Sequence, residues 1–370
     1  MIPLVDLKAQ YAGIREEIMP AITEVIASGR FIGGPAVAGF ENMFREFCEV
    51  GHVVGCANGT DALEIALWAL GIGDKDEVIC PSHTFIATAE AILRAGARPV
   101  FADIEPETHL LDPASVERNI TERTRAVIPV HLYGQPCEMD SIMAVARRNH
   151  LWVIEDCAQA HGARYDGKRV GTFGELGMYS FYPGKNLGAY GDGGAIVTNN
   201  HELARKIKMY ANHGRNQKYL HDFPGVNSRL DAIQAAVLTA KLKHLEEWNQ
   251  KRAEAAQVYH RLLDRVSDLV LPAHAPRRSH VYHLYVVQVP DGRRDDIIRQ
   301  LKSDGVEAGV HYPVPLHEQP AFVHLGYRPE DLPVTHRVAS RIISLPMFPE
   351  ITQEQIGAVA RALTSAIASR

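Results

Sequence analysis

Short apolar runs of roughly four residues alternate with helix-like stretches from Val53 to about Tyr210. Runs this short and this apolar are typical of a parallel sheet buried on both faces, because each βαβ connection lays a helix over the sheet. The pattern therefore predicts a three-layer α/β/α core. The expected strands are Val53–Cys56, Val78–Cys80, Pro99–Ala102, Ala126–Val130, Trp152–Glu155 and Ala195–Thr198, and the expected helices begin at Thr60, Ile86 and Asp140.

Helical patterns also flank this core. The chain before it is expected to contain an extended piece at Ile2–Asp6, an amphipathic helix ending near Gly29, a break at Gly33–Pro35 and a helix over Phe40–Phe47. After the core, the stretch from Leu230 to about Leu263 has strong helix formers and few breakers. It therefore predicts one long helix that leads out of the core.

The C-terminal part is expected to form a smaller α+β domain. Its expected elements are a strand at Val281–Val289, helices near Asp295–Asp304 and at Gln353–Ala368, and a loop rich in proline and histidine at His311–His317. We therefore assign residues 1–245, including an N-terminal arm, to the large domain and residues 246–370 to the small one.

Composition excludes several classes of function. The net charge is −5 and no basic stripe is present, so nucleic-acid binding is not expected. No apolar run approaches the roughly 18 residues of a membrane span. The five cysteines are scattered without a C-x-x-C pair, which argues against a disulfide framework or a zinc site and favours a reducing cytoplasm. No metal site is expected.

The segment Tyr179–Ala195 carries the strongest chemical signal. Lys185 is its only basic residue and lies among five glycines, just after Pro183. Glycine has no Cβ, so backbone and a bulky ligand can approach each other closely. A desolvated lysine amine is a nucleophile suited to Schiff-base chemistry with a carbonyl compound.

Two further motifs follow predicted strands. Gly59 and Thr60 open a helix directly after the first strand, where free N–H groups favour an anion such as phosphate. Taken alone, the motif fits a plain Asn or Thr N-cap better. Glu155 and Asp156 end a buried strand and should point to opposite sides. Asp156 would face the crevice, where a carboxylate can keep a pyridine nitrogen protonated, or it would equally well cap a helix.

Other candidate residues lie at the same edge or before the long helix. Gln159 could donate to the phenolic oxygen of such a cofactor, and the ring of Phe85, in Pro81–Phe85, could stack on it or belong to the core. Asn227, in Gly225–Asp231, precedes the long helix and suits either a helix start or a phosphate contact, in its own site or in that of a neighbouring subunit.

Together these motifs resemble the DegT/DnrJ/EryC1/StrS group of sugar aminotransferases, which use pyridoxal 5′-phosphate (PLP). The resemblance runs from Pro3–Lys8 to the His311 loop. It is carried by Asn58–Thr60, Pro81–Phe85, Glu155–His161, Ser180–Lys185, Gly191–Gly194 and Asn227–Arg229. It implies fold type I and a homodimer with active sites at the subunit interface.

The resemblance also implies residue roles. Lys185 would bind the cofactor covalently and move protons, while Asp156 would pair with the pyridinium nitrogen. Gln159 would touch the phenolic oxygen and Phe85 would stack on the ring. The phosphate would be held by Gly59, Thr60 and Ser180, with Asn227 reaching in from the partner chain. Phenol and imidazole groups at Tyr182, His311, Tyr312 and His317 could contact the substrate or could simply be packed loop residues.

The implied reaction moves an amino group from L-glutamate to a ketone on a nucleotide-linked hexose. The form Ser180–Gly188 resembles members that aminate C3 of dTDP or UDP sugars more than members that act at C4. Some relatives have histidine in place of the lysine and act as dehydratases, so the lysine favours transamination. Two alternatives from other classes are a non-catalytic PLP-binding regulator and a Rossmann-type dehydrogenase. The dehydrogenase is disfavoured because no G-x-G-x-x-G follows the first strand.

Overall fold

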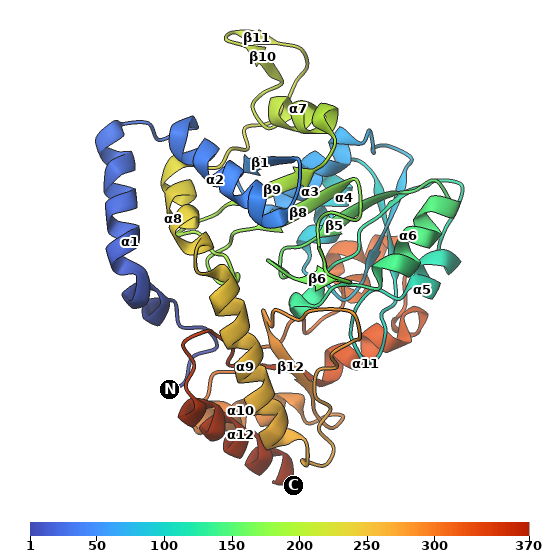
Figure 1. Cartoon of the computed structure of the whole chain (residues 1–370). Coiled ribbons are helices and arrows are strands. Elements are labelled where there is room, and N and C mark those ends of the chain that lie inside the picture. The colour runs from blue at the N-terminus through green and yellow to red at the C-terminus, as the bar shows by residue number, and fades with distance from the viewer. Residues whose placement is uncertain (370) are drawn as a thin grey trace.

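The centre of the fold is a seven-stranded sheet with the strand order β1-β9-β8-β5-β4-β2-β3. A computed structural model describes residues 1–369 (Figure 1). All six predicted core strands are present, and the expected α/β class is confirmed. The strands are β1 His52–Cys56, β2 Glu77–Pro81, β3 Arg98–Ala102, β4 Thr124–Val127, β5 Trp152–Asp156, β8 Leu176–Ser180 and β9 Gly194–Thr198.

The sheet is mixed, which corrects the expectation of an all-parallel core. Strand β9 runs antiparallel to both of its neighbours, β1 and β8, whereas β8, β5, β4, β2 and β3 are parallel. The reason lies in the connection: β8 and β9 are joined by the loop that carries Lys185 and not by a helix. A parallel pair needs a crossover, usually helical, so strands joined this way pair antiparallel.

Both faces of the sheet are buried. Along β9, Ile196 belongs to one apolar cluster, whereas Ala195 and Val197 belong to another. Side chains of a strand alternate between faces, so the two clusters cover opposite faces of the sheet at β9. The helices that follow the strands are α3 Gly59–Ala69, α4 Ala87–Arg94, α5 Pro113–Arg118, α6 Met139–Arg148 and α7 His201–Tyr210.

The N-terminal helices agree with their sequence signals. Helix α1 (Leu7–Ser28) is capped by the Asp6 side chain, which accepts from the backbone N–H groups of Lys8 and Ala9, and it ends at Gly29 with φ of 64°. Helix α2 (Gly34–Cys48) starts earlier than predicted because Pro35 lies in its first turn, where a missing N–H costs nothing.

The long helix predicted for Leu230–Leu263 is wrong. The structure has two helices, α8 (Ala232–Leu242) and α9 (Leu245–Leu263), separated at Lys243 and His244. Leu238 of α8 packs in a cluster against the sheet, whereas Tyr259 of α9 packs in a separate C-terminal cluster. Local helix propensity does not report such a change of packing partner.

The C-terminal part contains a two-stranded antiparallel ladder, β12 (Tyr285–Gln288) with β13 (Ile342–Leu345). Strand β12 is shorter than the predicted Val281–Val289, because Tyr282 has φ of 43° and the backbone N–H of Val281 donates to Gly134 instead. Helices α10 (Arg294–Ser303) and α12 (Gln353–Ala368) confirm their predictions. The elements not foreseen here are α11 Pro333–Arg341 and the 3₁₀ turns Leu316–Glu318, Pro320–Leu325 and Pro329–Asp331.

These unforeseen elements tie the C-terminal part to the sheet. Leu316, Phe322 and Val338 belong to the same apolar cluster as strands β2 and β4. The domain boundary after residue 245 stays a prediction. Two small hairpins complete the fold: β6 (Arg164–Tyr165) with β7 (Lys168–Arg169), and β10 (Arg215–Gln217) with β11 (Leu220–His221), which projects beyond the body of the molecule (Figure 1). Within residues 1–369, no helix has the length and apolar character that crossing a membrane requires.

Candidate active site

A cavity of about 740 Å³ opens at the carboxyl ends of the parallel strands. Its wall includes residues that directly follow β1, β2, β4 and β5, and residues of β8 and its following loop. Segments far apart in the chain meet there, because parallel strands end at the same edge of a sheet. The predicted site residues that line it are Gly59, Thr60, Phe85, Asp156, Gln159, Ser180, Tyr182, Lys185, His311 and Tyr312.

Lys185 lies on a tight loop between β8 and β9. Its backbone N–H donates to the carbonyl of Tyr182 at 2.9 Å. A Cβ on Gly188 would lie 2.3 Å from the carbonyl oxygen of Pro183, so the loop can close only with glycine there. From α8, the buried Lys241 ammonium donates to the Gly188 carbonyl at 2.8 Å. The loop is therefore held by this contact with α8 as well as by its own turn.

Lys185 and Asp156 share the cavity, and their charged forms attract each other. Burial lowers the pKa of the Lys185 amine to about 8, and the attraction of Asp156 only partly offsets this. Burial also raises the pKa of Asp156, with the N–H of Ala158, the charge of Lys185 and the hydroxyl of Thr88 acting against the shift. Each shift follows from the cost of holding a charge out of water. The amine is therefore more often neutral, and hence nucleophilic, than a lysine in water.

Glu155 and Asp156 point to opposite faces of β5, as predicted. Asp156 lines the cavity, and its two carboxylate oxygens accept from Thr88 Oγ1 at 3.2 Å and from the N–H of Ala158 at 3.1 Å. Glu155 is fully buried on the other side and is not a member of the cavity wall. The two acids therefore do not form a catalytic carboxylate pair.

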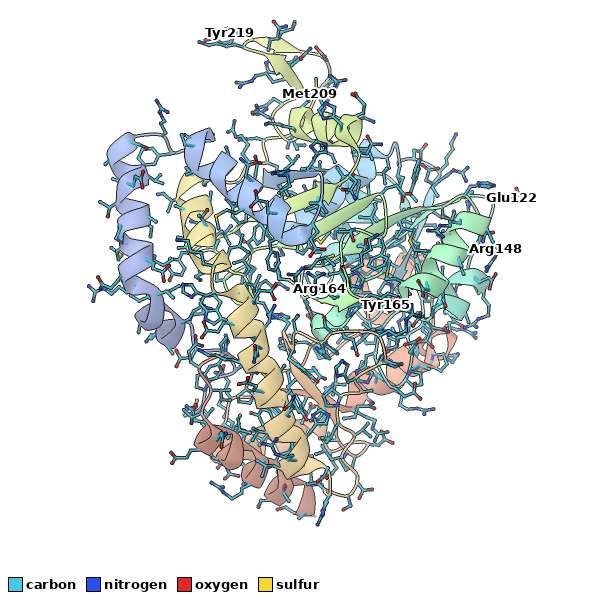
Figure 2. The ribbon with its side chains drawn as sticks, in the orientation of Figure 1. Glu122, Arg148, Arg164, Tyr165, Met209 and Tyr219 are labelled. Atoms are coloured by element: carbon cyan, nitrogen blue, oxygen red, sulfur yellow. The ribbon has the colours of Figure 1, made fainter. Side chains whose placement is uncertain are left out.

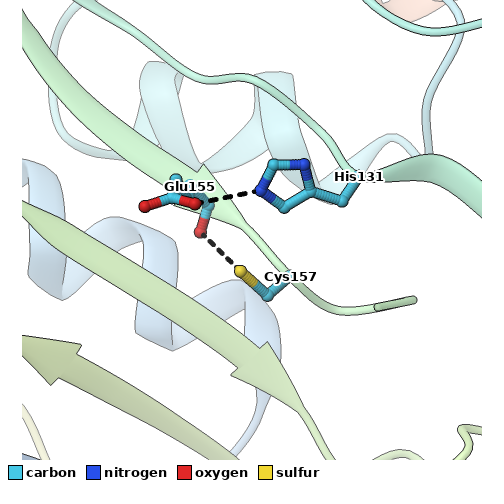
Figure 3. A group of neighbouring side chains, drawn as sticks. All are labelled: His131, Glu155 and Cys157. Atoms are coloured by element: carbon cyan, nitrogen blue, oxygen red, sulfur yellow. Dashed lines mark hydrogen bonds and ion pairs between the residues drawn. The ribbon is translucent and has the colours of Figure 1, made fainter. Parts of the chain in front are cut away.

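Glu155 is the centre of a buried cluster with His131 and Cys157 (Figure 3). His131 Nδ1 accepts from the N–H of Cys137, so Nε2 carries the proton and donates to Glu155 at 3.1 Å. Three backbone N–H groups of the 171–174 loop also donate to this carboxylate, at 2.6–2.9 Å. A metal ion would have to displace these bonds, so the arrangement serves to anchor the end of β5.

The start of α3 forms a cradle beside Ser180. The Asn58 side chain caps the helix by accepting from the N–H of Asp61 at 2.8 Å. The N-cap that the sequence offered as one interpretation of this motif is therefore present. Gly59 and Thr60 still line the cavity, and the first N–H groups of a helix have no partner within it. A Cβ on Gly59 would lie 2.7 Å from the Cβ of Ser180, so only glycine permits this approach.

Aromatic and amide groups form another part of the cavity wall. Phe85 is 53% exposed and its ring lies 5.6 Å from that of Tyr312, which places it in the cavity and not in the core. Gln159 is buried, and its Nε2 donates to the phenol oxygen of Tyr312 at 3.1 Å. Tyr182 lines the cavity with 61% of its surface exposed.

Two predicted site residues lie elsewhere. His317 is buried, and its Nδ1 and backbone N–H both bond to Ser82 Oγ, at 2.7 and 3.1 Å, outside the cavity wall. The structure therefore does not bring His317 to the site, because the chain turns into the core at this point. Asn227 is exposed and does not line the cavity of its own chain.

Sequence patterns did not point to several residues that line the cavity. Among them are Thr88, His283 and Leu284. Thr88 lies in the first turn of α4, three residues after Phe85 of the Pro81–Phe85 motif, so its nearness to that motif was a usable signal. His283 and Leu284 come from the C-terminal half of the chain, and no local pattern places them at this edge.

The sequence profile of the DegT/DnrJ/EryC1/StrS aminotransferase family matches residues 12–364. The chain belongs to this family. The resemblance drawn from the motifs is thereby confirmed, and with it the enzyme class, a PLP-dependent aminotransferase of fold type I.

Individual family members are similar along nearly their whole length. The chain is 49% identical over 356 residues to the "Pleiotropic regulatory protein" of Geobacillus stearothermophilus, covering 96% of this chain and 95% of that protein. It is 46% identical over 354 residues to the dTDP-3-amino-3,4,6-trideoxy-alpha-D-glucose transaminase of Streptomyces venezuelae, covering 96% and 93%.

Solved structures of family members agree with the fold. The X-ray structure of DesV from S. venezuelae in complex with a ketimine intermediate superposes with a TM-score of 0.97 at 44% identity, covering 100% of this chain and 99% of that one. The structure of NtdA from Bacillus subtilis with bound cofactor PMP gives a TM-score of 0.90 at 35% identity, covering 98% and 83%.

The cavity of this aminotransferase fits PLP. The cradle at Gly59 offers unpaired N–H groups for a phosphate, and Lys185 offers an amine of lowered pKa for the aldehyde. Asp156 offers a buried carboxylate for a ring nitrogen, and Phe85 offers an exposed aromatic face. These groups lie in one cavity, and each of them matches one part of the cofactor: the phosphate, the aldehyde, the ring nitrogen or the face of the ring.

Proposed function

We propose that this aminotransferase moves the amino group of L-glutamate to a keto carbon, C3, of a nucleotide-linked keto-(deoxy)hexose in amino-sugar biosynthesis. The observation that carries the proposal is the convergence of Lys185, Asp156 and Gln159 on a single cavity of about 740 Å³. That volume is within the range of small-molecule sites, and the complete set of groups is what transamination requires.

The residues of the chain have distinct tasks in this reaction. When bound, PLP supplies an electron sink that stabilises negative charge on the reacting carbon. Lys185 provides the amine that takes a proton from one carbon and returns it to another, a role that typically contributes about 10²–10⁴-fold in rate. Asp156 holds a compensating negative charge in a buried place. Ser180, Gly59 and Thr60 would bind the phosphate.

The sugar would be bound by the aromatic and imidazole groups at the mouth of the cavity. Tyr182, His311 and Tyr312 line it and can donate or accept hydrogen bonds with hydroxyl groups. His317 is left out of this set because it is buried against Ser82. The placement at C3 is supported by the S. venezuelae relative, whose name describes a 3-amino sugar.

The position of the new nitrogen is the point that an experiment must decide. Purified enzyme, PLP and L-glutamate should be incubated with 3-keto and 4-keto hexoses linked to dTDP or UDP, and the products examined by NMR. We expect nitrogen on C3. A product with nitrogen on C4 would instead support the alternative C4 aminotransferase on a dTDP- or UDP-linked 4-keto sugar.

A non-catalytic PLP-binding regulator is the second candidate, and one observation favours it. The 49% identical relative is named a pleiotropic regulatory protein. A regulator has no need of Lys185, Asp156 and Gln159 together at one cavity, so the geometry favours the enzyme. If the protein were only a regulator, it would bind PLP and L-glutamate but would turn over none of the keto sugars.

We also infer a homodimer with shared sites, in the cytoplasm. Asn227 is exposed and away from its own cavity, as expected of a residue that serves the partner's phosphate. Tyr219, at the tip of the β10–β11 hairpin, is 86% exposed and projects from the body (Figure 2). A large aromatic residue held out in this way is suited to contact with another chain. The five buried, unpaired cysteines fit a reducing compartment.

A further inference from the structure

The short turn Leu132–Gly134, which follows β4, lies at the junction of several segments that build the cavity. Tyr133 has φ of 60° and ψ of −1°, a left-handed conformation that is unusual for a residue with a large side chain. Its side chain is only 5% exposed. Such a conformation persists only where the surroundings hold it, so its contacts are informative.

The backbone of Tyr133 contacts Gln159, which belongs to the part of the cavity where PLP would bind (the cofactor side). Its N–H donates to Oε1 of Gln159 at 2.8 Å, which leaves Nε2 of Gln159 to donate to the phenol oxygen of Tyr312 at 3.1 Å. The orientation of the Gln159 amide is thereby fixed from both ends. A backbone bond of this kind survives any replacement of the Tyr133 side chain other than by proline.

The phenol of Tyr133 contacts the His311–Tyr312 segment, which belongs to the part of the cavity where the keto sugar would bind (the acceptor side). It donates to the backbone carbonyl of His311 at 2.5 Å and lies 2.6 Å from Nε2 of His83. Because its single proton is used on His311, the phenol oxygen accepts from His83. Burial lowers the pKa of His83 to about 3, so its ring is neutral and carries that proton on Nε2.

Gly134 extends the junction to a further segment. It has φ of 103°, and a Cβ there would lie 3.0 Å from the backbone nitrogens of Tyr282 and His283. The Gly134 carbonyl accepts from the N–H of Val281 at 2.9 Å. His283 lines the cavity, so the turn touches the wall at Gln159, at His311 and at His283.

We propose that Tyr133 is a positioning residue that fixes the His311–Tyr312 segment relative to Gln159, and so sets the acceptor side of the cavity against the cofactor side. The turn itself does not line the cavity, so Tyr133 would act through the residues that do. This inference rests on the proposed function, because the acceptor would be the keto sugar. The two sides are joined through one residue, whose backbone holds Gln159 and whose phenol holds His311.

The test compares Tyr133→Phe with Tyr259→Phe. Tyr259 is a matched control because it is fully buried and its phenol donates to a backbone carbonyl, that of Pro346, at 2.9 Å, in the C-terminal cluster. Each variant loses one buried hydroxyl and keeps its ring. Tyr133→Phe also removes the acceptor of the His83 Nε2–H, so it should lose somewhat more thermal stability than Tyr259→Phe. Only the Tyr133 variant releases the His311 carbonyl.

The first readout is amide hydrogen exchange in the protein without substrates, which requires no knowledge of the sugar. Exchange over residues 309–314 should become faster in Tyr133→Phe and stay at the wild-type rate in Tyr259→Phe. The same rate over this segment in all three proteins would overturn the proposal. So would equal acceleration in both variants, since that would reflect lost stability alone.

The second readout separates the two half-reactions. With the keto sugar that the wild-type enzyme turns over, KM should rise about fivefold to tenfold in Tyr133→Phe, the effect of roughly one lost buried hydrogen bond. The visible absorption of bound PLP and the rate with L-glutamate should stay unchanged, because the backbone bond to Gln159 remains. Equal losses in both half-reactions would contradict the proposal. If no sugar were turned over, the proposed function would fail, and hydrogen exchange would still decide the role of Tyr133.

Discussion

Lys185 and Asp156 illustrate how burial alone prepares a site at the scale of single residues. The same desolvation lowers the pKa of the amine and raises the pKa of the acid, and their mutual attraction opposes both shifts. The lowered pKa of Lys185 means that a large share of the enzyme carries a neutral amine near pH 8. A free lysine, with a pKa of about 10.4, would be almost wholly protonated there.

The rate of PLP capture by the cofactor-free enzyme should therefore depend on pH in a specific way. Protonated lysine is not a nucleophile, so the rate should rise with pH and level off above about 8, where the amine becomes neutral. Stopped-flow absorbance of PLP binding, with Lys185→Ala as the control that captures none covalently, measures this. A rate still climbing toward about pH 10.5 would show an amine in ordinary surroundings.

Single residues were predictable from sequence where a strand end determined their position. Asp156 and Gly59 each lie at or just after the end of a predicted strand, so the edge of the sheet places them together, and Lys185 was marked by its glycine-rich segment. His317 was misplaced and Tyr133 was missed, because burial and the meeting of distant segments decide their roles. No pattern within a few residues of either position reports a partner such as Ser82 or His311.

At the scale of elements, the contact between the start of α3 and the end of β8 shapes the cradle that we propose for the cofactor phosphate. Gly59→Ala should destabilise the protein by about 1–3 kcal/mol, because the new Cβ would lie 2.7 Å from the Cβ of Ser180. The affinity for PLP should fall by about tenfold or more, since the cradle must open to accept the methyl group. Thermal unfolding and a PLP titration followed by absorbance measure the two effects.

Gly13→Ala is the matched control for this substitution. Gly13 lies in α1, where a Cβ would meet no atom within 4 Å. Alanine favours a helix over glycine by up to about 1 kcal/mol, so this variant should be as stable as the wild type or slightly more stable. A Gly59→Ala protein that bound PLP as tightly as Gly13→Ala would contradict the account of the cradle.

Elements were predictable where local pattern and packing agree. Helix α12 was placed at its observed bounds because its cap and apolar period coincide. The direction of β9 and the break between α8 and α9 were not predicted. Both depend on which element lies beside them in the fold, and strand or helix propensity carries no information about that neighbour.

At the scale of the whole molecule, the exposed position of Asn227 supports an active site completed by a second copy of the chain. If the site is shared, Lys185→Ala and Asn227→Ala should each be inactive alone but recover activity when mixed and allowed to exchange subunits. About half of the dimers would then be hybrids, each with one intact site, which gives about a quarter of the wild-type activity.

Two outcomes of this mixing experiment would contradict shared sites. One is the absence of any recovery after subunit exchange, which would place both residues in the same chain's site. The other is full activity of Asn227→Ala by itself, which would remove the residue from the phosphate contact. Mass spectrometry of the intact mixture would verify that hybrid dimers had formed.

The most direct test of the central claim is the visible absorption spectrum of the purified enzyme with PLP, recorded before and after L-glutamate is added. We expect a visible band from the lysine-bound cofactor that L-glutamate converts to the shorter-wavelength band of the aminated cofactor. In Lys185→Ala the lysine-bound band should be absent and the conversion should fail. A wild-type band that L-glutamate leaves unchanged, or conversion at the wild-type rate in the variant, would contradict the assignment of Lys185 as the residue that carries out transamination from L-glutamate.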